Sequence, residues 1–389
     1  MTFRKPGWAL VGAVLVASAV ALLLFRGTPP SSPDSTDSVS AARQPTSSGV
    51  LVGTPSGASP PTEPTPAIEQ LPMPGCWDGG LRQLDKAATL DSLREALAVA
   101  VGNRDNLLAA YLQERLTELV GQDAGRALQV VEWAKQASPP QLGLYLDALK
   151  AAPAVHDAKV SQALLTLGED KSLPLQNRSA ALDALETQRR LSPGDLARLK
   201  AVALDETADS TAWVATRTLG RVMKEDFERT GTHAPYWKEL LSIAGQSDDM
   251  AVRLLALEMP SYSNPLIGSE SFDELKRILT TDRERDVREM AAFRLGVTRE
   301  PEEALKIYEA AFEKEHDVCV RWAIFRFAVR AAGEQALPML ARLAAKDPRF
   351  QRDYTEFKQL YASGTVDFAR IWLGKGEHHA CLVEEGAPH

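Results

Sequence analysis

Residues 286–296 read Asp-Val-Arg-Glu-Met-Ala-Ala-Phe-Arg-Leu-Gly, and weaker copies of their Val-Arg-x-x-Ala pattern occur before and after them. The positions that share this register are 34, 41, 35 and 33 residues apart and are Arg178, Ala212, Arg253, Arg288 and Arg321. Intervals of this length are typical of repeats in which each unit is a pair of helices. The sequence therefore predicts an array of stacked helix pairs.

The composition favours an all-α fold. The chain contains seven Trp and eleven Phe among many Leu and Ala, which is sufficient for a helical core, whereas the alternating Val-rich runs typical of a sheet are scarce. Helices are expected to pair as 236–244 with 250–259, 272–279 with 286–296, and 304–313 with 318–332. We assign the helical array to residues 76–362 and a C-terminal extension to residues 363–389.

An uncharged apolar run at residues 8–25 follows a short basic N-terminus, residues 1–7. As a helix this run is about 27 Å long, close to the thickness of a bilayer core. A cleaved signal peptide is the alternative, but its apolar region is normally about 7–15 residues and is followed by small residues. Here the run ends with Leu-Leu-Leu-Phe at 22–25, so we expect an uncleaved transmembrane helix, or signal anchor, in contact with the lipid bilayer.

The charges that flank this helix predict its orientation. Arg4 and Lys5 precede it and only Arg26 follows closely, which favours a cytoplasmic N-terminus. The bulk of the chain is then expected to be periplasmic or extracellular. Residues 26–75 contain eleven prolines among Ser, Thr and Gly, a composition that cannot bury enough apolar surface to fold and that predicts a disordered linker.

The chain has a net charge of −8, and its acidic and basic residues are interleaved. Nucleic-acid binding depends on clustered Lys and Arg that neutralise phosphates, so no nucleic-acid partner is expected. The three cysteines, Cys76, Cys319 and Cys381, lack Cys-x-x-Cys spacing. Cys319 is interpreted as a small core residue, and a bridge between Cys76 and Cys381 stays open.

Motifs for catalysis or cofactor binding are missing from the sequence. It contains no His-Glu-x-x-His, Gly-x-Ser-x-Gly, phosphate-binding loop or dinucleotide fingerprint. His378, His379 and Cys381 are of types that bind metals, but adjacent ligands in a tail are weak evidence for a site. We therefore predict a non-enzymatic protein without catalytic residues, cofactor or metal. A lyase or hydrolase on a helical-repeat scaffold remains the alternative, as does a cleaved, secreted binding module.

The repeated stretches carry a resemblance to a known family. Asp286-Val287-Arg288-x-x-Ala291, Val252-Arg253-x-x-Ala256 and Val320-Arg321 resemble the second-helix signature of HEAT repeats, a type of armadillo-like helical repeat, over roughly residues 105–345. The resemblance implies a right-handed α-solenoid, and the positions with a structural role in it are Arg178, Arg253, Arg288, Arg321, Ala181, Ala215, Ala256 and Ala291. The intervals near 34 residues also suit tetratricopeptide repeats, so the type of individual repeats stays open.

In HEAT repeats the arginine typically interacts with an acidic residue about six positions earlier. The resemblance therefore implies that Arg288 pairs with Asp282 and that Arg321 pairs with Glu315. Serines occupy the equivalent positions before Arg178 and Arg253, at Ser172 and Ser247. These departures predict an interrupted series of ion pairs.

The best candidate for a partner-binding surface is Arg321, Arg326 and Arg330, since these arginines have few acidic neighbours in sequence and belong to a second helix. Trp322, Phe325 and Phe327 lie on the same helix, and we expect two of them in the core and one exposed as an anchor. The arginines between 277 and 299 are interleaved with Asp and Glu and are interpreted as solvated ion pairs. The sequence thus predicts a membrane-anchored scaffold that binds an unidentified protein.

Overall fold

The computed structural model describes residues 88–205, 210–364 and 381. The predicted membrane anchor, the linker and nearly all of the C-terminal extension lie outside these residues. The described residues form the following α-helices: α3 (Leu90–Gly102), α4 (Asn106–Val120), α5 (Ala124–Ala134), α6 (Pro139–Ala151), α7 (Ala158–Glu169), α8 (Leu175–Ala184), α9 (Pro193–Ala203), α10 (Thr211–Thr230), α11 (Ala234–Gln246), α12 (Met250–Glu258), α13 (Phe272–Thr281), α14 (Arg285–Leu295), α15 (Pro301–Lys314), α16 (Val318–Ala332), α17 (Leu337–Lys346) and α18 (Gln351–Ala362).

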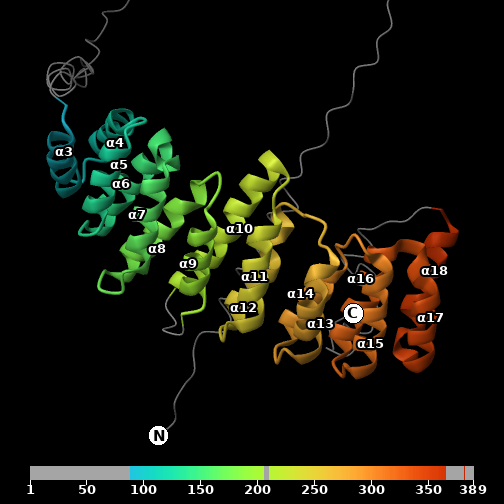
Figure 1. The fold of residues 1–389 in the computed structure, drawn as a ribbon. Coiled ribbons are helices and arrows are strands. Elements are labelled where there is room, and N and C mark those ends of the chain that lie inside the picture. The colour runs from blue at the N-terminus through green and yellow to red at the C-terminus, as the bar shows by residue number, and fades with distance from the viewer. Residues whose placement is uncertain (1–87, 206–209, 365–380, 382–389) are drawn as a thin grey trace, which may run out of the picture. The chain divides into compact units, whose positions relative to one another are not determined.

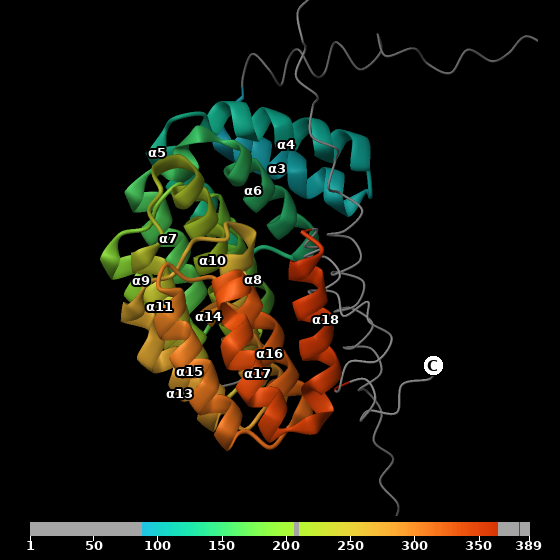
Figure 2. The ribbon, with the colours of Figure 1, turned by 90° about the vertical axis from the view of Figure 1, so that its right-hand side faces the viewer.

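The helices pack in two rows (Figure 1). The odd-numbered helices from α5 to α17 each contact the next odd-numbered helix, and the even-numbered helices from α4 to α16 do the same in a second row. Successive helices such as α7 and α8, α11 and α12, or α13 and α14 join the two rows. Figure 2 shows α7, α9 and α11 on one side and α6 and α8 on the other. Each pair thus buries its apolar faces against its own partner and against the pairs on either side.

Aspartates fix where many of these helices begin. The carboxylate of Asp249 accepts hydrogen bonds from the backbone N–H groups of Ala251 and Val252, at 2.7 and 3.3 Å. Asp317 does the same for Cys319 and Val320 at the start of α16. These bonds satisfy amides that have no partner inside the helix, and they place a negative charge at its positive end. The polar turns between the repeats therefore set the phase of the apolar stripes that follow.

The all-α prediction is confirmed for the part of the chain that the structure describes. Within residues 88–205 and 210–364 the only strand-like pairing is an isolated bridge between Ile267 and Thr298. The helices carry alternating small and large apolar residues, such as Ala256 and Leu257 or Ala291 and Leu295, whose side chains are wholly buried. None of the described helices combines the length and apolar character needed to cross a membrane.

A disulfide joins Cys319, in the first turn of α16, to Cys381. The prediction for Cys319 was therefore wrong in part, because its side chain is buried in the core as expected but its sulfur is bonded. The open possibility of a bridge between Cys76 and Cys381 is replaced by this pairing. The sequence could not indicate it, since the two cysteines are 62 residues apart and come together only through the packing of the last helices.

Candidate functional site

The arginines that share the Val-Arg-x-x-Ala register form a series of ion pairs between neighbouring helix pairs. Arg253 on α12 donates from Nε and Nη2 to the carboxylate of Asp282 at 2.9 and 3.1 Å. Arg288 on α14 binds Glu315 in the same way, with a shortest distance of 2.8 Å. Arg321 continues the series on α16 through a 2.8 Å bond to Asp347.

The same arginines also bind the backbone of the turn that precedes them. Arg288 Nη1 donates to the carbonyl of Asp282 at 2.9 Å, and Arg321 Nε donates to the carbonyl of Glu315 at 2.7 Å. The residue six positions before each arginine thus accepts a hydrogen bond through its backbone carbonyl. Its side-chain carboxylate binds a different arginine, the one in the preceding repeat. The pairing implied by the family resemblance was therefore wrong in its acceptor atom.

This arrangement brings Arg253 into the series, where the serine at position 247 predicted an interruption. Arg253 needs no acid at position 247, because Nη1 binds the carbonyl of Ser247 at 3.0 Å and the acid comes from the next repeat. Arg178 similarly donates to the carbonyl of Gly168 at 3.1 Å. The alanines assigned to the repeat are fully buried: Ala181, Ala215, Ala256 and Ala291.

The predicted contact arginines fall into two different environments. Arg321 belongs to the series of ion pairs, and its guanidinium also lies 4.9 Å from the centre of the Phe312 ring. Arg326 lies over two aromatic rings, 4.1 Å from Trp322 and 4.4 Å from Phe327. Arg321 is thus held in place as part of the fold, whereas Arg326 and Arg330 belong to a separate group.

We call that group the arginine–aromatic cluster; its members on α14 and α16 are Phe293, Arg294, Trp322, Arg326, Phe327 and Arg330. Phe293 is central, because the guanidinium groups of Arg294 and Arg330 lie 4.7 and 4.1 Å from its ring centre. Its ring also meets that of Phe327 edge to face at 5.2 Å. Aromatic rings attract cations through their negative faces, so this arrangement holds several positive charges close together.

Arg294 is the least expected member of the cluster. Its side chain is fully buried, and its Nη2 donates to Ser261. Its Nε and Nη1 atoms are also buried and have no hydrogen-bond partner in the described structure. A buried cation is costly unless it is paired and hydrogen-bonded. Arg294 therefore stores unfavourable free energy at this position.

Burial shifts the ionisation of the groups in and around the cluster. It lowers the pKa of Arg294 to about 9, with a further decrease from the charge of Arg330 and an opposing increase from Glu258. Burial also lowers the pKa of Arg326 to about 10 and that of Arg330 to about 10. All three guanidinium groups remain charged at pH 7.

The pKa values of the carboxyl groups beside the cluster shift upwards, in the opposite direction to those of the arginines. Burial raises the pKa of Glu258 and of Glu289 above the ordinary value for Glu, although Arg294 and Arg326 respectively act against these shifts. In neither case does the arginine restore the ordinary acidity of the carboxyl group.

The expectation of one exposed aromatic on α16 was wrong. Trp322, Phe325 and Phe327 are all buried, with at most 6% of the side chain exposed. They point in different directions, but α16 is covered on several sides, because Phe325 stacks on Phe350 and Phe357 while Phe327 meets Phe293. The aromatic rings thus act as supports for the arginines.

Several arginines between 277 and 299 form solvated ion pairs, as the sequence predicts. Arg277 pairs with Glu274, and Arg285 lies within 3.5 Å of Glu289, both in exposed or half-exposed positions. Arg294 is the exception that sequence reasoning missed. Its spacing gave a signal, because it follows Val287 and Ala291 at the seven- and three-residue intervals of the buried stripe.

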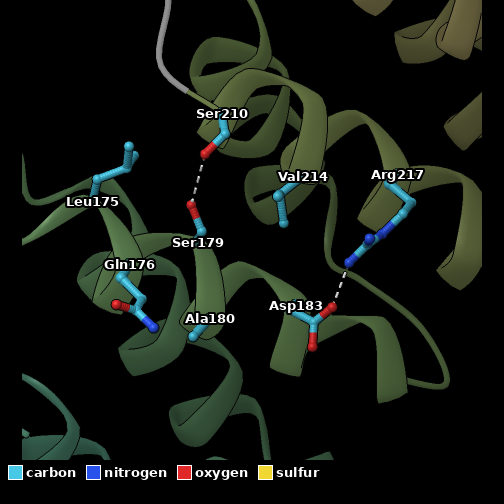
Figure 3. Close-up of a pocket in the computed structure, with 8 residues that line it drawn as sticks. All are labelled: Leu175, Gln176, Ser179, Ala180, Asp183, Ser210, Val214 and Arg217. Atoms are coloured by element: carbon cyan, nitrogen blue, oxygen red, sulfur yellow. Dashed lines mark hydrogen bonds and ion pairs between the residues drawn. The ribbon is translucent and has the colours of Figure 1, made fainter. Parts of the chain in front are cut away.

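A hollow of about 570 Å³ lies between α8 and α10 (Figure 3). Ser179 and Ser210 approach within 3.4 Å across it, and Asp183 binds Arg217. Its lining residues are Leu175, Gln176, Ser179, Ala180, Asp183, Ser210, Val214 and Arg217.

The charged groups of this hollow are satisfied by one another. Asp183 also accepts from Lys150 at 2.5 Å, and Arg217 also binds Glu186. The Arg217 guanidinium lies 5.0 Å from the ring centre of Trp213, which is 39% exposed. The hollow therefore offers apolar walls to an entering side chain, and its ion pairs are already complete.

Comparison with known proteins gives no relative from which a function can be transferred. No protein-family model matches the chain, and no curated protein matches it in sequence. Among the described side chains, no group of three or more His, Cys, Asp or Glu converges on a position suited to a metal ion. The function must therefore be inferred from the surfaces themselves.

Replacing Arg294 by methionine is expected to raise the free energy of unfolding by about 1–4 kcal/mol, because exchanging a buried charge for an apolar side chain of similar length often stabilises a protein. Chemical denaturation of the wild type and of Arg294→Met measures this change. The matched control is Arg342→Met, in an exposed pair with Glu309, for which a change below about 1 kcal/mol is expected. A loss of stability in Arg294→Met would show that Arg294 is a structural requirement.

Proposed function

We propose that the protein is a membrane-anchored, non-enzymatic scaffold whose helical region is a HEAT-like, right-handed α-solenoid that binds another protein outside the cytoplasmic membrane. The two rows of packed helices and the ion pairs that connect successive repeats support the solenoid assignment. Repeat arrays of this kind use extended surfaces for binding. The apolar run at residues 8–25 supports the anchor.

The disulfide supports the proposed location. Disulfide bonds form and persist mainly in oxidising compartments, such as the periplasm or the extracellular space. Cys319 and Cys381 are bonded, and the basic residues Arg4 and Lys5 precede the apolar run. Both features favour a cytoplasmic N-terminus and a helical region on the outer side of the membrane.

The observation that carries the proposal is the arginine–aromatic cluster. Arg and aromatic residues contribute most of the binding free energy in many protein interfaces. Arg326 and Arg330 are partly exposed and are positioned on fixed rings, so they lose little side-chain freedom when a partner binds. A cluster that is costly to maintain, with Arg294 buried behind it, also fits a surface kept for binding.

In-cell crosslinking of the tagged full-length chain, followed by mass spectrometry, tests the proposal. We expect a reproducible protein partner that is lost in the double variant Arg326→Glu/Arg330→Glu. The matched control is Arg342→Glu/Lys346→Glu, which also reverses two charges four residues apart, on α17, where these residues pair with Glu309 and Glu313. The control is expected to retain the partner.

Two further measurements make the result decisive. Thermal unfolding of both double variants establishes that loss of the partner is not loss of the fold. The variant Leu175→Ser, beside the α8–α10 hollow, reports whether that apolar surface contributes, since Leu175 is 43% exposed. If the wild type yields no reproducible partner, the scaffold proposal fails.

A further inference from the structure

The hollow between α8 and α10 runs along two facing stripes of side chains (Figure 3). The stripe on α8 has a spacing of four residues and comprises Leu175, Ser179 and Asp183. The stripe on α10 has spacings of four and three and comprises Ser210, Val214 and Arg217. Residues at these spacings lie on one side of a helix, and eight residues of helix extend about 12 Å. The volume of about 570 Å³ lies within the range of about 300–1,000 Å³ found for binding pockets.

Two exposed apolar side chains border this hollow. Leu175 is 43% exposed and forms part of the wall. Trp213 is 39% exposed and lies at the edge, because it is three residues after Ser210 and four before Arg217, which both line the hollow. Among the described side chains, three other large apolar groups are exposed, all on other elements: Val99, Leu107 and Leu266. Exposed apolar groups gathered in one place mark binding surfaces, and Trp is frequent among the residues that dominate interfaces.

The charged side chains of the hollow favour an uncharged occupant. Both charged lining residues are paired, since Asp183 binds Arg217 and also accepts from Lys150 at 2.5 Å, and Arg217 also binds Glu186. An incoming charge would lose its water of hydration and find the opposite charges of the lining already engaged. An apolar side chain would instead displace water from the walls that Leu175 and Val214 provide.

The polar side chains of the lining favour a polypeptide over a lipid chain. Gln176 is exposed and contributes an amide, with N–H donors and a carbonyl acceptor. A peptide group carries one donor and one acceptor of the same kinds, whereas an acyl chain carries neither. Figure 3 shows Gln176 on α8, on the same helix as Leu175 and Ser179. The hollow thus combines apolar walls with an amide that can bind a backbone.

We propose that the hollow between α8 and α10 binds an uncharged segment of a partner polypeptide, which inserts large apolar side chains between Leu175 and Val214 while its backbone binds the Gln176 amide. This inference rests on the proposed function, in that the occupant is a protein. It adds a contact surface whose chemistry differs from that of the arginine–aromatic cluster.

The test selects peptides from a phage-displayed random library on the purified full-length protein in lipid nanodiscs. Fluorescence polarisation then measures the Kd of the enriched peptides, labelled with fluorescein, for the wild type and four variants. Leu175→Ser removes part of the apolar wall, and Ala180→Trp fills the hollow. Their matched controls are Leu107→Ser on α4, where Leu107 is 84% exposed, and Ala310→Trp on α15, where Ala310 is exposed.

We expect the enriched peptides to contain neighbouring large apolar residues without charged residues between them. Leu175→Ser and Ala180→Trp are each expected to weaken binding by about tenfold or more, as for loss of a dominant interface contact. Leu107→Ser and Ala310→Trp should leave the Kd unchanged. Thermal unfolding of all four variants checks that a loss of binding is not a loss of the fold, and the exposed position of Leu175 makes Leu175→Ser the safer of the two.

The inference is overturned if no peptide is enriched, if the enriched peptides insert charged residues, or if Leu175→Ser and Ala180→Trp bind them as well as the wild type does. A fluorescent fatty acid serves as the probe for a lipid site. If it binds with the same dependence on Leu175 and Ala180 while no peptide does, the hollow is a lipid site and the inference also fails. A crosslinked partner that depends on Arg326 and Arg330 would in each case leave the scaffold proposal standing.

Discussion

Substituting Arg253 by alanine is expected to lower the free energy of unfolding by about 3–5 kcal/mol, the range for removing one partner of a buried ion pair. Arg253 and Asp282 are 6% and 10% exposed, so water cannot replace the lost partner. The substitution also removes bonds to the carbonyls of Ser247 and Asp248, both 3.0 Å long. Three acceptors in two consecutive repeats thus lose their donor together.

The matched control is Arg342→Ala. Arg342 also donates from Nε and Nη2 to one carboxylate, that of Glu309, at 2.8 and 2.9 Å, but its side chain is 56% exposed. Exposed pairs contribute about 0–1 kcal/mol, so a small change is expected. Urea denaturation followed by circular dichroism measures both variants. Equal effects of Arg253→Ala and Arg342→Ala would refute a structural role for the series of buried pairs.

A conservative replacement, Arg253→Lys, refines this test. Lysine preserves the charge but cannot bind the Asp282 carboxylate and two carbonyls at once, because it lacks the planar arrangement of donors. We expect it to recover only part of the lost stability. Full recovery would mean that the charge alone matters and that the geometry of the guanidinium does not.

The helical architecture was predictable because a local pattern determines it. The Val-Arg-x-x-Ala register located α12, α14 and α16, and the predicted span 318–332 agrees with α16. Helix α7, Ala158–Glu169, was missed, although its apolar residues follow the same spacing. The partner of each repeat arginine was also missed, because an acid 26 to 29 residues later becomes a neighbour only when one helix pair stacks on the next.

The candidate site was predictable only in its exposed part. Arg326 and Arg330 were found because their four-residue spacing places them on one side of a helix. Arg294 was grouped with its charged neighbours, since an arginine in an acidic and basic stretch is normally solvated. Its burial depends on Phe293 and on the contact between α14 and α16. The residue pattern of one helix does not reveal which other helix will pack against it.

Removing the disulfide is expected to lower the free energy of unfolding by about 4 kcal/mol, the value that loop-closure entropy gives for a bridge between residues about 60 apart. The bond between Cys319 and Cys381 restricts the unfolded chain over a separation of 62 residues. That span includes α16, α17 and α18, so its loss should destabilise the C-terminal end of the helical array first.

Peptide mapping without reductant provides the direct check, and it should recover a crosslinked peptide that contains Cys319 and Cys381. Denaturation of Cys381→Ser and of the wild type treated with a reductant should then give the same decrease in stability. Cys76→Ser is the control, because Cys76 takes no part in the bond. A substantial effect of Cys76→Ser, or a wild type insensitive to reductant, would contradict the pairing. Since the bridge begins about one turn before Trp322 and about two turns before Arg326 on α16, its loss also tests whether the arginine–aromatic cluster depends on a fixed helix start.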